Sequence, residues 1–144
     1  MKITYPPVIL LSALMIQTVL YLTYPVLFNL SIIFGIFIIL SGIALVYISL
    51  KKLSKMETTF IPDGNPTKLV VDGPFKISRN PIYLGMVLIL LGTAISLQSF
   101  SSLLVTIIFF LIINFTWITH EEKKLSKIFG EDWQEYSSKT RRWL

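Results

Sequence analysis

Two long stretches of the chain contain no Asp, Glu, Lys or Arg. The first runs from Ile3 to Leu50, and the second runs from Pro81 to Thr119. An apolar run of about 18 residues or more is typical of a transmembrane helix, because about 20 helical residues cross the hydrocarbon core of a bilayer. Both stretches exceed that length, so the pattern predicts an integral membrane protein.

Each uncharged stretch is long enough for two helices and is interrupted near its middle. In the first, Tyr24 precedes a proline, which disfavours helix there, and Asn29 can cap a new helix. The second is interrupted by the polar segment LQSFSS at 97–102. We therefore predict an all-α, multi-pass membrane protein with about four transmembrane helices, near residues 7–24, 29–50, 81–98 and 101–119.

The charged residues divide the molecule into two sides. All 13 Lys and Arg residues lie before the first helix, in the 51–80 loop, or in the 120–144 tail, whereas the connectors near Pro25 and Gln98 carry none. The positive-inside rule places the basic side in the cytoplasm. We expect a protein of the cell (inner) membrane with both termini cytoplasmic, and a first helix that is retained because no small-residue cleavage site follows it.

The low fraction of charged residues, the lack of cysteine and the single histidine exclude several classes of protein function. The chain is 53% hydrophobic and 15% charged, against about 25% charged in an ordinary soluble domain, and its length predicts one membrane domain, 1–144. With no cysteine and one histidine, disulfides, thiolate nucleophiles and a metal site are not expected. The net charge of +5 is explained by topology and by contact with membrane lipids, so no nucleic-acid partner is expected.

The 51–80 loop ends in a group of polar residues at the start of the third helix. It contains turn signals at 62–66 and 72–74, with TKLVV between them as a short strand or an extended piece. RNPIYLG (79–85) follows. Asn80 and Pro81 are typical of a plain helix start. If these residues have no function beyond structure, Arg79 is a positive charge that sets the membrane orientation or contacts lipid, and Tyr83 is an aromatic residue of the membrane interface.

The 120–144 tail predicts an amphipathic segment on the membrane surface. Leu125, Ile128 and Phe129 follow helical spacing, Gly130 is a natural helix stop, and aromatic residues alternate with basic ones up to Trp143. No dinucleotide-binding or phosphate-loop motif occurs in either charged segment.

Glu121 and Glu122 lie at the end of the fourth predicted helix, where acids are costly unless they meet cations or hydrogen-bond donors. Arg79 and Asn80 are candidate partners. Gly85, with Gly92 seven residues later, marks a small-residue face that either lets helix backbones approach closely or leaves room for a ligand.

Two segments resemble a known superfamily of membrane enzymes. LVVDGPFKISRNPIYLG (69–85) resembles a Gly-Pro-aromatic-x-x-x-Arg-His/Asn-Pro-x-Tyr-x-Gly pattern of the isoprenylcysteine carboxyl methyltransferases, and EEKKLSKIFGEDWQEYSSKTRRWL (121–144) is similar to their C-terminal ending. The resemblance covers roughly residues 65–144. The same superfamily includes phospholipid N-methyltransferases, which share the Asn-Pro-x-Tyr-x-Gly stretch and the acidic pair.

The resemblance implies a methyltransferase that uses S-adenosylmethionine and acts on a lipidic or hydrophobic small-molecule acceptor at the cytoplasmic membrane face. The donor is expected between the last helices and the tail. Residues that match the family's motifs are the candidate donor-binding set: Arg79, Asn80, Tyr83, Gly85, Glu121, Glu122, Arg142 and Trp143. The candidate catalytic residues are His120, Glu121 and Glu122.

The chain departs from the carboxyl methyltransferase pattern at two places. Asn80 replaces a histidine, and no arginine occurs at positions 117–120, where those enzymes carry one for the substrate carboxylate. An amine acceptor, with His120 as its base, is the alternative to a prenyl-cysteine, and a plain position at the membrane interface is the other role open to His120. A non-catalytic membrane scaffold or partner subunit is the competing class. Sterol reductases that use NADPH have a related ending but many more spans.

Overall fold

The structure is a computed structural model that describes residues 6–58, 64 and 66–144. Its helices are α1 (Pro6–Thr23), α2 (Ile32–Lys55), the short 3-10 helix η1 (Gly73–Lys76), α3 (Pro81–Ser96), α4 (Phe100–Ile113), the π-helical turn η2 (Asn114–Ile118) and α5 (Thr119–Lys139). Among these described residues there is no strand, and the only β-type pairing is an isolated bridge between Leu27 and Ser99. The predicted all-α class is confirmed.

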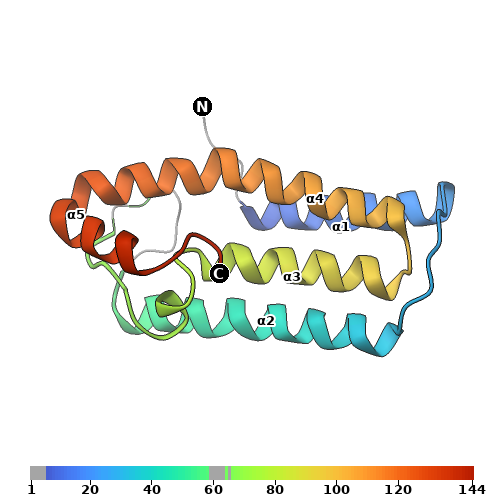
Figure 1. The fold of residues 1–144 in the computed structure, drawn as a ribbon, viewed down its shortest axis with the longest axis horizontal. Coiled ribbons are helices and arrows are strands. Elements are labelled where there is room, and N and C mark those ends of the chain that lie inside the picture. The colour runs from blue at the N-terminus through green and yellow to red at the C-terminus, as the bar shows by residue number, and fades with distance from the viewer. Residues whose placement is uncertain (1–5, 59–63, 65) are drawn as a thin grey trace.

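Helices α1 to α4 run along the long axis of the molecule (Figure 1). Helix α2 packs along α3, and α1 packs on α4 and α3. The short connectors around residues 24–31 and 97–99 lie at one end, while the loop before α3 and the turn of α5 lie at the other (Figure 1). We call the second end the charged end, because the described Lys and Arg residues belong to its loop, its helix ends and α5; Lys2 lies outside the described residues.

In the part of the chain that the structure describes, three helical stretches are long and apolar enough to cross a membrane: α1, α2 and the continuous helix Phe100–Lys139. Helix α3 is apolar but has 16 residues. This pattern confirms a multi-pass membrane protein. The helix that begins at Phe100 continues past Thr119, where the sequence predicted a boundary, because no proline or glycine interrupts it before Gly130. At Gly130, with φ 49°, the chain bends and the remainder of α5 turns back (Figure 1).

Two pairs of glycines bring α2 and α3 into close contact. A Cβ built on Gly85 would lie 2.7 Å from the carbonyl oxygen of Gly42, and a Cβ on Gly92 would lie 2.6 Å from that of Gly35. Small residues permit this backbone approach, which replaces hydrophobic burial as the source of helix association in a membrane. Of the two possibilities that the sequence left open, Gly85 and Gly92 serve helix packing.

A buried amide ties three helices together near the other end of the bundle. Gln17 in α1 is fully buried, and its Nε2 lies 3.0 Å from the carbonyl oxygens of Leu90 and Ser102 and 3.1 Å from Oγ1 of Thr106. Because an unpaired amide is costly in an apolar interior, these contacts fix α1 against α3 and α4 in one register.

Several local expectations differ from the structure in detail. Helix α2 begins at Ile32 after Ser31, so Asn29 is not its cap, and residues 69–71 belong to no strand. The turn predicted at 72–74 is realised as η1, where Gly73 adopts a φ of 62°. Most of the turn predicted at 62–66 lies outside the described residues.

Candidate functional site

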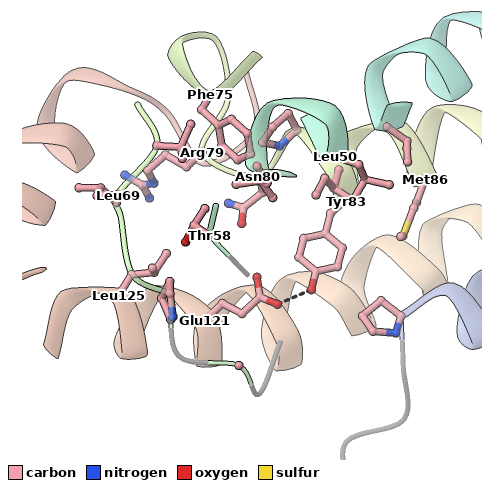
Figure 2. A pocket seen from close by; sticks show the side chains of 18 of the residues that line it. Leu50, Thr58, Leu69, Phe75, Arg79, Asn80, Tyr83, Met86, Glu121 and Leu125 are labelled. Carbon is pink, nitrogen blue, oxygen red and sulfur yellow. Dashed lines mark hydrogen bonds between the residues drawn. The ribbon is translucent and has the colours of Figure 1, made fainter. Parts of the chain in front are cut away.

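A cavity of about 360 Å³ opens at the charged end of the bundle, beside the first turn of α3. Residues of α1, α2 and α3 form its apolar wall on the bundle side, and polar residues come from the start of α3 and from the first two turns of α5 (Figure 2). The apolar part is lined by Leu10 of α1, Val46 and Leu50 of α2, and Ile82, Met86 and Ile89 of α3. The polar part is lined by Arg79, Asn80, Tyr83, Glu121 and Lys124. Pockets of this size and mixed character hold small-molecule ligands.

Tyr83 and Glu121 form the polar pair that faces the cavity. The phenol of Tyr83, which is buried, donates a hydrogen bond of 2.6 Å to Oε1 of Glu121 (Figure 2). Hydrogen bonds to an ionised acceptor are short and strong. The pair therefore holds a carboxylate in a defined position at the cavity wall.

Glu122 takes no part in this pair and instead accepts hydrogen bonds from Arg79 and Arg142. Its Oε1 accepts from Nε of Arg79 at 3.1 Å, and its Oε2 accepts from Nη2 of Arg142 at 2.6 Å. The side chains of Glu122 and Arg79 are only 11% and 15% exposed, while that of Arg142 is 35% exposed. The network therefore joins the start of α3, the long helix and the C-terminal residues through one largely buried carboxylate.

Asn80 occupies the N-cap position of α3 but does not cap it through its side chain. Its Nδ2 instead donates to the carbonyl oxygen of Arg142 at 3.1 Å and approaches Oε1 of Glu122 at 3.4 Å. Its backbone N–H is taken by Oγ of Ser78, which itself donates to the same Arg142 carbonyl. The plain helix-start account thus explains the position of Asn80 but not its amide group, which binds the tail.

Arg79 also stabilises the end of α5. Its Nη1 donates to the carbonyl oxygens of Ser137 at 2.8 Å and Thr140 at 3.2 Å, and its guanidinium lies 5.8 Å from the ring centre of Trp133. A cation at a helix C-terminus satisfies carbonyl groups that have no intrahelical partner. Because Nη1 of Arg79 binds the end of α5 while Nε and Nη2 face Glu122, this residue connects the loop before α3 to both parts of the long helix.

Tyr136, also in α5, connects the tail to the loop that precedes α3. Its hydroxyl donates to the carbonyl oxygen of Phe75 at 2.6 Å, and burial raises the pKa of Tyr136 to about 12. The phenol therefore remains a hydrogen-bond donor throughout the physiological pH range. With Trp133 and Phe75, it forms an aromatic part of the cavity wall.

The last residues of the chain lie against the long helix. Nε1 of Trp143 donates to Oδ1 of Asn114 at 3.0 Å, and its ring packs on Phe110 with centroids 4.7 Å apart. Arg142 and Trp143, both candidates from the sequence, are thus brought to the site through Asn114 and Glu122, and neither belongs to the described cavity lining.

Two candidate residues are placed elsewhere. His120 is exposed and lies outside the described residues that line the cavity. Gly85 likewise is not part of that lining, since it packs against Gly42. The sequence reasoning missed Ser78 and Asn114; the signal for Asn114 was a lone amide within an uncharged apolar run.

The fold and the site define an integral membrane protein with a cavity that is polar toward its charged end and apolar toward the bundle. The sequence profile of the phospholipid methyltransferase family matches residues 30–132, which is more than half of the chain. The chain belongs to the phospholipid methyltransferase family, and the predicted superfamily is confirmed. It is therefore a membrane methyltransferase by family.

A curated relative gives no further functional information. An uncharacterized protein of Haemophilus influenzae is 41% identical over 63 residues, which are 44% of this chain and 100% of that protein. No solved structure matches the chain.

Proposed function

We propose that this protein transfers a methyl group from S-adenosylmethionine to a lipid acceptor at the cytoplasmic face of the membrane. The observation that carries the proposal is the two-part cavity, in which the Tyr83–Glu121 pair stands at one end and side chains of three apolar helices at the other. Family membership supports methyl transfer, and the position of the basic residues supports the cytoplasmic face.

The residues at the cavity fit the chemistry of S-adenosylmethionine. That donor carries an ammonium and a sulfonium, which suit the carboxylate of Glu121, and a purine, which suits an apolar and aromatic wall such as Phe75 and Leu125. When bound, it supplies a methyl group on a positively charged sulfur, which a nucleophilic acceptor atom can displace directly. The protein's own task is then to position two reactants, and no covalent nucleophile is needed.

Glu121 is the residue to which we assign the central role. The hydrogen bond from Tyr83 fixes its carboxylate, so it can hold positive charge at the cavity wall without rearrangement. His120 has no part in this proposal because its side chain is exposed outside the cavity lining. Arg79, Asn80 and Glu122 are proposed to shape the site through the tail.

The apolar wall supports a lipid as the acceptor. Among the described residues, α1 and α2 share no extensive contact with each other, although both flank α3, and the apolar cavity lining comes from these three helices. An acyl chain would be costly to move into water, so we propose that the acceptor reaches the cavity from the bilayer, on the side lined by α1 and α2. The cavity of about 360 Å³ is in the range that holds one small-molecule ligand, so the acyl chains of the acceptor would stay in the membrane.

Binding and transfer experiments test this function. Purified protein in lipid nanodiscs would be titrated with S-adenosylmethionine, and methyl-labelled donor would be incubated with a membrane lipid extract to identify the labelled product. Glu121→Gln should lose both activities, while Glu131→Gln, an exposed acid on the same helix, should retain both. Absence of donor binding at millimolar concentration would favour a non-catalytic scaffold, and labelling of a water-soluble acceptor would overturn the lipid assignment.

A further inference from the structure

The side chain of Asn114, which belongs to neither of the two family-like motifs, contacts the C-terminal residues outside the cavity. Oδ1 of Asn114 accepts from Nε1 of Trp143 at 3.0 Å and lies 3.5 Å from Nη1 of Arg142. Asn114 is the first residue of the π-helical turn η2, and its own carbonyl accepts from Oγ1 of Thr119. Such turns insert one residue into a helix and often occur at functional sites.

This contact is the first member of a chain of interactions that ends at the cavity. Arg142 also contacts Glu122, because its Nε and Nη2 donate to Oε2 of that carboxylate at 3.1 Å and 2.6 Å. Glu122 in turn binds Arg79 and approaches Asn80, and these two side chains line the cavity. A disturbance at Asn114 would therefore reach the polar wall through two arginines and one carboxylate.

The backbone of the same C-terminal residues adds a second link. The carbonyl oxygens of Arg141 and Arg142 accept from the N–H of Arg79 and the amide of Asn80, at 3.0 Å and 3.1 Å. The tail is thus docked on the start of α3 on one side and on Asn114 on the other. Both sides must be in place for the polar wall to keep its shape.

We propose that Asn114 is a positioning residue that latches the C-terminal residues Arg142 and Trp143 and thereby sets the donor side of the cavity. It acts through Arg142 and Glu122 and leaves the apolar wall untouched, so its loss should affect the donor rather than the lipid acceptor. The donor readout rests on the proposed function, whereas the latch itself is a property of the fold.

Two variants remove the latch in different ways, and a third preserves it. Asn114→Leu is close in size and removes the acceptor oxygen, whereas Trp143→Phe keeps a ring against Phe110 and removes only the N–H donor. Asn114→Asp keeps an acceptor and places a carboxylate beside Arg142. If the amide oxygen is the functional part, Asn114→Asp should restore what Asn114→Leu loses.

The first measurement is limited digestion with trypsin, scored by mass spectrometry as cleavage after Arg141 and Arg142, whose carbonyl groups are hydrogen-bonded in the docked tail and which we expect to be protected there. We expect Asn114→Leu and Trp143→Phe to raise the cleavage rate at least tenfold, with a double variant no worse than the more severe single variant. Asn114→Asp should stay within about threefold of the wild type. Equal rates in all variants would overturn the latch, even if the protein proved not to bind a donor.

The second measurement separates donor from acceptor. Asn114→Leu should raise the Kd for S-adenosylmethionine at least tenfold and leave the KM for the lipid acceptor unchanged. A rise in both, or an equal loss in Asn114→Asp, would show that the residue only supports the fold and would overturn the positioning role. If wild-type protein binds no donor while the trypsin pattern follows the expectation, the latch stands and the proposed function fails.

Discussion

Replacing Glu122 by glutamine should destabilise the docked tail more than any other single change of one acid to its amide. The carboxylate accepts from Arg79 through Nε and Nη2, both at 3.1 Å, and from Arg142 through Nε and Nη2, at 3.1 Å and 2.6 Å. Glutamine keeps one oxygen acceptor and presents N–H groups where the second oxygen was, so one cation loses its partner.

The size of the effect depends on how deeply each partner is buried. Removing one member of a buried ion pair costs about 3–5 kcal/mol, because the remaining charge is left uncompensated. The range applies to Arg79, whose side chain is 15% exposed, whereas the pair with Arg142 is screened by solvent at 35% exposure and contributes less than about 1 kcal/mol. Because glutamine retains one acceptor, we expect a net loss of about 3 kcal/mol, which corresponds to roughly a 150-fold shift in the docking equilibrium.

Thermal unfolding of the protein in detergent, followed by tryptophan fluorescence, measures this loss. A change of about 3 kcal/mol should lower the melting temperature by on the order of 6–12 °C. Glu135→Gln is the matched control, because Glu135 on the same helix pairs with Lys139 while both side chains are more than two-thirds exposed. We expect no measurable change for that variant.

A double-mutant cycle tests the physical reason. Arg79→Gln combined with Glu122→Gln should cost about 1–3 kcal/mol less than the sum of the two single changes, since the cation left unpaired by the second is removed by the first. Equal melting temperatures for Glu122→Gln and Glu135→Gln, or strictly additive losses in the cycle, would refute the reasoning.

Three further predictions follow from the helices and the cavity. Tyr83→Phe removes the 2.6 Å hydrogen bond to Glu121 and should weaken S-adenosylmethionine binding by about 1.5–3 kcal/mol, the range for losing a hydrogen bond to a charged group; calorimetric titration that shows wild-type affinity would remove this pair from the site. Gly92→Ala forces a methyl group to within 2.6 Å of the Gly35 carbonyl and should cost about 1–3 kcal/mol in stability, while Thr18→Ala on an exposed face should cost little; equal melting temperatures would contradict the close helix contact. The chain has no native cysteine, so an impermeant maleimide added to intact cells should label Thr23→Cys and spare Ser138→Cys, and the reverse pattern would invert the proposed topology.

The sequence by itself determined the class of the molecule. Uncharged runs longer than a membrane span predict helices without reference to any partner, because the bilayer alone sets their length and forces backbone hydrogen bonds to close within the helix. The bend at Gly130 followed from the conformational freedom of glycine, and the motifs around Arg79 and Glu121 were sufficient to predict the superfamily.

The tertiary structure decided which way the side chains of those motifs face. Asn80 has the sequence context of a helix cap, yet its amide binds the carbonyl of Arg142, 62 positions away in the chain. Glu121 and Glu122 are neighbours in sequence, but one pairs with Tyr83 at the cavity and the other with two arginines at the tail. His120, one residue earlier, points outward.

Such differences arise because a helix in a membrane has little hydrophobic contrast between its faces. Lipid and protein interior are both apolar, so the apolar pattern of α2 and α3 does not tell whether the faces of Gly42 and Gly85 meet lipid, a ligand or each other. The π turn at Asn114 further offsets the face of the helix that carries the acidic pair. Only the packing of all helices together sets these rotations, and with them the arrangement of the cavity.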